Sequence, residues 1–226
     1  MLNLVANRDK LYLLIIKERQ VKNIVNGLMV AAALLFSGAA LSAELGKDYK
    51  VLNPAQPASG AKIEVLKFFF YGCSHCYALH SQLSAWEKTM PKDVELIYVP
   101  TIFRDSWEPM ARTFYALDAM GQLHSLHDPL YQAWNVSNTD LSDEAKILNY
   151  VAPRGVDRTK FSAAYKSFAV QSRVTRAKQM IRSYGISSTP TLVVDGKYTI
   201  NGLQPADTIR VLDELIAMAR KERSKK

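Results

Sequence analysis

Residues 63–80 read IEVLKFFFYGCSHCYALH, and this stretch decides the fold. Its first half is an almost continuous apolar run, which is typical of a strand buried on both faces of a sheet. Gly72 ends the run, and Cys73 and Cys76 follow three positions apart. Beyond them apolar residues recur at helical spacing until Pro91 stops the pattern. The sequence therefore predicts a strand that leads directly into a helix, with both cysteines at the helix N-terminus.

The rest of the chain extends this unit into an α/β sheet domain. Residues 94–103, VELIYVPTIF, predict a second strand, so the order strand, helix, strand forms a βαβ unit. Residues 191–200 predict a hairpin around the turn Asp195-Gly196, and Pro205 opens a last helix. Between the two halves, capping residues such as Ser142 and Asp157 and apolar spacings predict only helices. We expect a sheet domain over 44–105 and 185–226 and an all-helical insertion over 106–184.

The N-terminal segment has the pattern of an export signal. An apolar run over 28–41 follows basic residues and precedes small ones, and it is shorter than the roughly 20 residues of a membrane span. We predict a cleavable signal peptide over residues 1–43, cut after Ala43 or alternatively after Ala40. An uncleaved anchor is the other reading. Translation from Val21 would give the compact basic region that such signals have.

Composition and charge narrow the class of protein. The 226 residues carry 29 basic and 21 acidic side chains, a formal net charge of +8. This excess is spread along the chain, so we predict no nucleic-acid partner. Two cysteines are too few for a disulfide-stapled scaffold or a four-cysteine zinc site. Both cysteines belong to the exported part of the chain, which we expect to work among oxidants.

Two cysteines at the start of a helix can carry redox chemistry. The free N–H groups and the positive end of the helix dipole favour a thiolate at Cys73 and lower its pKa. Cys76 lies inside the first turn and would act as the resolving thiol. His75 adds a donor or a positive charge near the Cys73 sulfur. Because a stabilised thiolate is a good leaving group, the disulfide would be given away readily.

Two other uses of the cysteines have to be weighed. A purely structural disulfide is a poor explanation, since so small a ring constrains little of the unfolded chain. A metal site could combine Cys73, Cys76 and His80 with His124 or His127, but these residues do not have the spacing of a zinc finger. We therefore expect no metal.

A proline directly before the hairpin is the second notable feature. Ser188-Thr189-Pro190 leads into a strand that the pattern places inside the sheet, where proline is tolerated only at a first residue or an edge. A cis Thr189–Pro190 bond would explain it economically. Taken alone, however, the general preference of X–Pro bonds favours trans.

The motif FYGCSHCYALH, the later hairpin STPTLVVDG and the helical stretch between them resemble the DsbA family of periplasmic thiol–disulfide oxidoreductases. The resemblance extends over about residues 47–222. It implies a thioredoxin fold with an inserted all-helical domain. It also implies location in the periplasm of a Gram-negative cell, no cofactor beyond the redox-active disulfide, and a monomer.

The resemblance assigns roles to four residues. Cys73 would be the nucleophile, Cys76 the resolving cysteine and His75 the stabiliser of the thiolate. Pro190 would be the cis-proline. Thr189, which precedes it, is a further candidate for the substrate site.

The reaction that the resemblance implies is donation of the Cys73–Cys76 disulfide to unfolded exported polypeptides through a mixed disulfide at Cys73. A DsbB-like membrane quinone reductase would then reoxidise the protein. The alternatives are a periplasmic metal- or peptide-binding protein that uses the same groove, or a reductase or isomerase of the same fold. An isomerase of this fold usually has a separate dimerisation domain, for which the chain leaves no obvious room.

The chain departs from the family pattern at two positions. Ser74 stands where a proline is usual, and Lys67 stands where many members have an acid that helps to move the proton of the resolving thiol. Glu64, three residues before Lys67, faces the opposite side of the strand. A lone buried ammonium is costly, so we predict that Lys67 pairs with Glu95 on the neighbouring strand. This pair is a candidate proton relay to Cys76.

Overall fold

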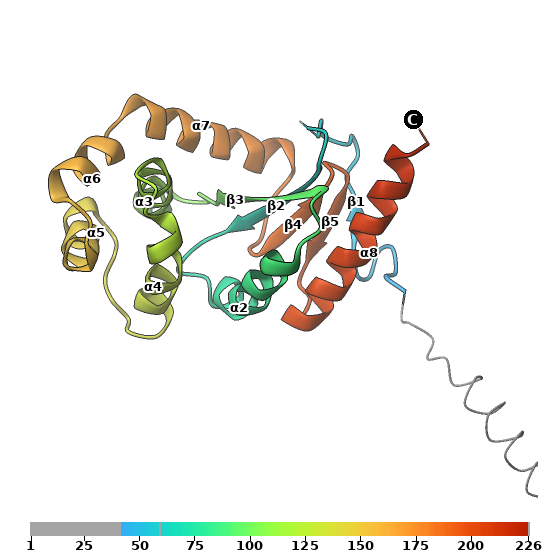
Figure 1. The fold of residues 1–226 in the computed structure, drawn as a ribbon, viewed down its shortest axis with the longest axis horizontal. Helices are drawn as coiled ribbons and strands as arrows, with labels where there is room; N and C mark the ends of the chain where they lie inside the picture. The colour runs from blue at the N-terminus through green and yellow to red at the C-terminus, as the bar shows by residue number, and fades with distance from the viewer. Residues whose placement is uncertain (1–41, 59, 226) are drawn as a thin grey trace, which may run out of the picture. The chain divides into compact units, whose positions relative to one another are not determined.

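Figure 1 shows the computed structural model, which describes residues 42–58 and 60–225. The apolar run of the predicted signal peptide and the alternative start at Val21 lie outside the described residues, so both stay predictions. Within the described part, no helix is long and apolar enough to cross a membrane.

A five-stranded sheet forms the centre of the fold, with the strand order β1-β5-β4-β2-β3. The central strand β2 is buried along its whole length, as its continuous apolar sequence predicts. It pairs in parallel with β3 and antiparallel with β4, which forms a hairpin with β5. The strands span Lys50–Val51 (β1), Ile63–Phe69 (β2), Val94–Pro100 (β3), Thr191–Val194 (β4) and Tyr198–Asn201 (β5).

Helices cover both faces of this sheet (Figure 1). Helices α2 and α8 lie together against one face, and α7 runs along the other, while α3 to α6 extend the molecule beyond the end of β2. The helices span Ser74–Thr89 (α2), Glu108–Ala119 (α3), Leu123–Asn135 (α4), Glu144–Val151 (α5), Arg158–Tyr165 (α6), Phe168–Ser183 (α7) and Pro205–Arg223 (α8), with short 3-10 turns at Asp105–Trp107 and Ala152–Arg154.

Local sequence signals set most of these boundaries. Asp157 caps α6 through its side chain, as its position before the helical pattern predicts. The cap of α5 is Asp143 and not the predicted Ser142, because the Asp143 carboxylate accepts the N–H of Lys146. In the β4–β5 hairpin, Asp195 and Gly196 both have positive φ angles, of 53° and 65°. A turn with two such residues matches the twist of the paired strands.

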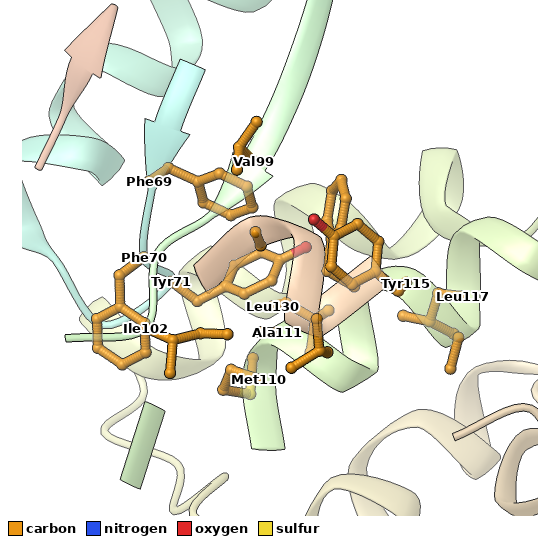
Figure 2. Close-up of a cluster of buried hydrophobic side chains, with 14 of the residues drawn as sticks. Phe69, Phe70, Tyr71, Val99, Ile102, Met110, Ala111, Tyr115, Leu117 and Leu130 are labelled. Carbon is orange, nitrogen blue, oxygen red and sulfur yellow. The ribbon is translucent and has the colours of Figure 1, made fainter. Parts of the chain in front are cut away.

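The buried side chains form two clusters. One lies between β2, β4, α2 and α8, and the other runs from the end of β2 into the helices that follow β3. Figure 2 shows part of the second cluster: Phe69 lies next to Val99 of β3, and Tyr71 from the chain after β2 is drawn with Met110 and Tyr115 of α3 and Leu130 of α4. The predicted sheet with helices inserted between β3 and β4 is therefore confirmed. The exact domain bounds 106 and 184 stay a prediction, because this cluster is continuous across them.

Gly72 joins this second cluster to the cysteines. The ring of Phe70 stacks on Trp107 with 3.9 Å between centroids, and Trp134 of α4 meets the edge of Phe70. A Cβ atom on Gly72 would lie 2.5 Å from Phe70 and 2.6 Å from Trp134. Glycine is thus the residue that lets the chain pass these rings on its way to Cys73.

We expect Gly72→Ala to lower the free energy of unfolding by about 1–3 kcal/mol, because the added methyl group overpacks two large rings. Urea denaturation monitored by tryptophan fluorescence measures this change. Gly60→Ala is the matched control, since its Cβ would meet no described atom closer than 3.8 Å. Equal stability of the two variants would contradict the packing argument.

Candidate active site

Cys73 occupies the N-cap position of α2. Its backbone is extended, and its sulfur accepts the N–H of Cys76 at 3.4 Å. This is the place usually taken by Ser, Thr, Asp or Asn, whose side-chain oxygens satisfy the first free N–H groups of a helix. The sequence predicted this placement from the position of the cysteines before the helical pattern. The structure contains both cysteines as free thiols.

The surroundings of Cys73 lower its pKa from 9.0 to about 5. The largest cause is a hydrogen bond from the Cys76 thiol, which partial burial opposes. Hydrogen bonds from the Thr189 side chain and from the backbone N–H groups of Cys76 and His75 lower the pKa further. At neutral pH the Cys73 sulfur is therefore almost entirely thiolate, the form that attacks disulfides and leaves from them.

Cys76 has the opposite properties. Its side chain is fully buried, and burial raises its pKa far above the ordinary value. The hydrogen bond to Cys73 and the charge of the Cys73 thiolate raise it further, because both favour the protonated thiol. The two sulfurs thus divide the roles: Cys73 is partly exposed and ionised, and Cys76 is enclosed and protonated.

The loop before β4 lies against the cysteines. The Thr189–Pro190 peptide bond is cis, as the resemblance implies, and the Thr189 carbonyl lies 3.3 Å from the Cys73 sulfur. Beside this contact is a groove of about 260 Å³ lined by His75, Thr189, Pro190, Leu192 and residues of the β5–α8 connection. The structure therefore brings together the four residues to which the resemblance gives roles and the further candidate Thr189.

His75 contributes to this site in two ways. Its backbone N–H donates to the Cys73 sulfur, which is one of the causes of the lowered Cys73 pKa. Its imidazole ring is exposed and lines the groove next to Pro190. The role of the ring itself in stabilising the thiolate stays a prediction.

The predicted Lys67–Glu95 pair is wrong. In the parallel ladder Lys67 lies opposite Tyr98, while Glu95 lies opposite Glu64, three residues earlier in β2. Side chains alternate between the faces of a strand, so Glu95 shares the face of Glu64 and points away from Lys67. Glu95 is exposed to solvent. The prediction failed because the pairing of two strands does not by itself give their register.

Lys67 instead belongs to a buried cluster of polar side chains that the sequence analysis did not assemble. Its members come from β2 and its continuation, α2, β3 and α4. Tyr71 and the Nδ1 atom of His127 are hydrogen-bonded at 2.7 Å, and the Tyr98 hydroxyl donates to Glu87 at 2.9 Å. His80 is bonded to Asp128 through Nε2. The signal available in the sequence was the spacing of four between His127 and Tyr131, which places both on one face of a helix.

This cluster borders a groove of about 710 Å³, which His80, Glu87, Tyr98, His127 and Asp128 help to line. Across the described ranges 42–58 and 60–225, no group of three or more His, Cys, Asp or Glu side chains could hold a metal ion. The alternative ligand set around Cys73, Cys76 and His80 therefore does not come together in the part of the chain that the structure describes.

Comparison with known proteins agrees with this geometry. A family model described as a DSBA-like thioredoxin domain matches residues 64–212. The thiol:disulfide interchange protein DsbA of Pseudomonas aeruginosa is 33% identical over 205 residues, which cover 88% of this chain and 97% of that protein. The protein of the same name from Bordetella pertussis is 36% identical over 203 residues, covering 86% and 96%.

Solved structures give the same result. The crystal structure of Pseudomonas aeruginosa DsbA matches with a TM-score of 0.76 at 33% identity, over 81% of this chain and 97% of that chain. The oxidoreductase DsbA from Xylella fastidiosa matches with a TM-score of 0.74 at 30% identity, over 78% and 97%. The fold and the asymmetric pair of thiols define a thioredoxin-fold thiol–disulfide oxidoreductase. Within that class, the chain belongs to the family of DsbA-like thioredoxin domains.

The lowered pKa of Cys73 can be measured directly. We expect the ultraviolet thiolate absorbance of the reduced protein to titrate at a pH of about 5. Cys73→Ser should remove this transition. Cys76→Ala should move it to higher pH, because that variant loses the thiol that donates the strongest hydrogen bond to Cys73. A transition near the ordinary value, or one that Cys76→Ala leaves in place, would contradict the assignment.

Proposed function

We propose that this protein donates the Cys73–Cys76 disulfide to newly exported, unfolded polypeptides. The observation that carries the proposal is the contrast between the two sulfurs. One sits at a helix N-terminus with a pKa of about 5, and the other is buried and protonated. Stabilising the thiolate favours the dithiol form of the protein, so its disulfide is readily reduced and acts as an oxidant.

The reaction takes place in two exchanges. A substrate thiolate attacks the Cys73 sulfur, the bond to Cys76 breaks, and Cys76 leaves as a thiolate that takes up a proton. A second substrate thiolate then attacks the substrate sulfur of the mixed disulfide, and Cys73 leaves as a stable thiolate. The substrate loses two electrons and forms a disulfide, and the protein gains them as a dithiol.

The groove beside Cys73 is the proposed substrate site. It combines Thr189 and Pro190 with the exposed ring of His75, and the buried side chains of Leu192 and Ile200 lie beneath it. An extended, unfolded segment suits a surface groove of this kind, because its own backbone is free and its side chains are not yet packed. A substrate bound here would have its cysteine next to the Cys73 sulfur.

The cellular setting is part of the same proposal. The predicted signal peptide over residues 1–43 would export the chain to the periplasm, where a DsbB-like membrane quinone reductase would return the dithiol to the disulfide. The relatives named DsbA support this setting. The first exchange of reoxidation again uses Cys73, and Cys76 then displaces the partner's thiol.

Trapping of mixed disulfides tests the roles of the two sulfurs. We expect Cys76→Ala to accumulate mixed disulfides with reduced, unfolded substrate, because it has no resolving thiol. Cys73→Ala should accumulate none, since Cys76 is fully buried. Non-reducing electrophoresis followed by mass spectrometry identifies the linked cysteine. If both variants trap substrate equally, the assignment of nucleophile and resolving thiol is refuted.

The direction of the reaction has its own test. The Cys73 pKa is depressed from 9.0 to about 5 in the folded dithiol. The unfolded dithiol therefore binds more protons between these values, and the stability of the reduced form rises with pH across this window. The lowered Cys73 pKa can add at most about 5 kcal/mol to the stability of the reduced form, and solvent screening makes this contribution smaller because Cys73 is partly exposed.

We expect denaturant unfolding to show the reduced form to be more stable than the oxidised form at neutral pH, with a difference that shrinks as the pH falls through about 5. His75→Ala should shrink the difference if the ring adds to the thiolate's stabilisation. An oxidised form that is the more stable at neutral pH would instead indicate a reductase.

A further inference from the structure

Helix α7 is strongly basic, and the reaction above leaves this charge unexplained. Its sequence, FAVQSRVTRAKQMIRS over Phe168–Ser183, contains Arg173, Arg176, Lys178 and Arg182 but no acidic residue. Helix α8, by contrast, mixes basic and acidic side chains along its length. The positive charge that the chain spreads over most of its sequence is therefore uncompensated within α7.

One side of α7 is buried and the other is open to solvent. Figure 1 shows the helix along the outside of the molecule, on the opposite side of the sheet from α2 and α8. Because an α-helix has about 3.6 residues per turn, Phe168, Arg176 and Arg182 lie on the side away from the buried stripe, and all three are exposed. The buried stripe consists of Val170, Val174, Ala177 and Ile181.

The four basic side chains of α7 differ in their surroundings. Arg173 forms an ion pair with Asp118 at 2.7 Å, and Lys178 forms one with Glu108 at 2.6 Å. Both carboxylates belong to α3, so these two cations are neutralised within the fold. The other two arginines of the helix form no ion pair with any residue that the structure describes, so their charge faces solvent.

An apolar ring shares the outer side of α7 with these two arginines. The Phe168 side chain is 85% exposed, more than any other large hydrophobic residue in the described part of the chain. It lies in the first turn of α7, and Arg176 and Arg182 follow about two and four turns later. A lone exposed ring needs no explanation by itself. Beside cations, and with no acid on the same helix, it matches the composition of surfaces that lie on lipid bilayers.

The chemistry of this outer side fits a phospholipid surface. A guanidinium group presents a planar set of donors that matches a phosphate group, and an anionic bilayer attracts basic side chains within about a Debye length. A phenyl ring gains free energy when it enters the boundary between headgroups and acyl chains. An acidic polypeptide would satisfy the arginines but leave the ring in water, so the lipid surface is the better match.

We propose that the outer side of α7, formed by Phe168, Arg176 and Arg182, docks this protein on a membrane surface that contains anionic phospholipids. The guanidinium groups bind lipid phosphates, and the phenyl ring enters the headgroup layer beside them. Helix α7 ends at Ser183, shortly before the loop that carries the cis-proline. Docking therefore holds the protein by the element that leads into the active site. The inference goes beyond the proposed disulfide exchange, because none of these residues takes part in that reaction.

Sedimentation with vesicles tests the docking surface. The exported, processed protein is mixed at low salt with vesicles of phosphatidylcholine alone or of phosphatidylcholine with phosphatidylglycerol. We expect binding only to the anionic vesicles. Arg176→Gln/Arg182→Gln should bind them about twentyfold more weakly, because each basic residue near the surface contributes about fivefold. The matched control is Lys88→Gln/Lys92→Gln, which removes two exposed charges from elsewhere and should bind nearly as tightly as the wild type.

A third variant separates the ring from the charges. Phe168→Ser should weaken binding to the anionic vesicles and keep the salt dependence of the wild type, because it removes no charge. Unchanged binding in this variant would refute the choice of a membrane as the partner. All the substituted side chains are exposed, and circular dichroism checks that each variant is folded.

Absence of wild-type binding to the anionic vesicles, or an equal loss in the two double variants, would overturn the inference. Binding to polyglutamate but not to vesicles, abolished in Arg176→Gln/Arg182→Gln, would also overturn it by identifying an acidic polypeptide as the partner. Substrate trapping by Cys76→Ala takes place without vesicles. Its failure would refute the proposed function and leave the vesicle result unaffected, whereas failure of vesicle binding leaves the proposed function standing.

Discussion

The first turn of α2 must deliver its free N–H groups to a sulfur, and the rest of the molecule is arranged around this requirement. Cys73 caps the helix in place of an oxygen-bearing side chain, so the stability of the helix end depends on the charge of a reactive thiol. The central strand β2 leads the chain to Cys73, and Gly72 leaves room for the backbone beside the rings of Phe70 and Trp134. The loop with the cis-proline also reaches this sulfur, since the Thr189 carbonyl lies 3.3 Å from it.

Much of this arrangement could be predicted because its causes are local. The unbroken apolar run of β2, the helical spacing after Cys76 and the Asp195-Gly196 turn each leave a mark in neighbouring residues. The helix caps are almost as clear, although the choice between Ser142 and Asp143 depends on which side chain reaches an N–H group. The cis state of Pro190 is different, because the local preference is for trans and only the resemblance pointed to cis.

What the sequence did not reveal are the long-range contacts around Lys67. The residue opposite Lys67 is Tyr98. It lies on the strand that was predicted to be adjacent, but identifying it requires the register between β2 and β3. A charged partner was expected because a buried ammonium is costly. The structure surrounds it with aromatic rings instead, one of them from Tyr131, which is more than sixty residues away along the chain. The helices that line the groove of about 710 Å³ therefore also help to surround the buried ammonium of Lys67.

The pH ranges of the two charges show when they can act together. Cys73 is a thiolate above a pH of about 5, and its contribution to the stability of the reduced form is complete only above 9.0. Lys67 is protonated below about 8, where its burial destabilises the fold. Between about 8 and 10.5 the unfolded chain binds the extra proton, so this destabilisation fades as the pH rises. Both charges therefore coexist between about 5 and about 8. Neutral pH lies inside this window, so there the thiolate of Cys73 stabilises the dithiol form while the buried charge of Lys67 destabilises the fold.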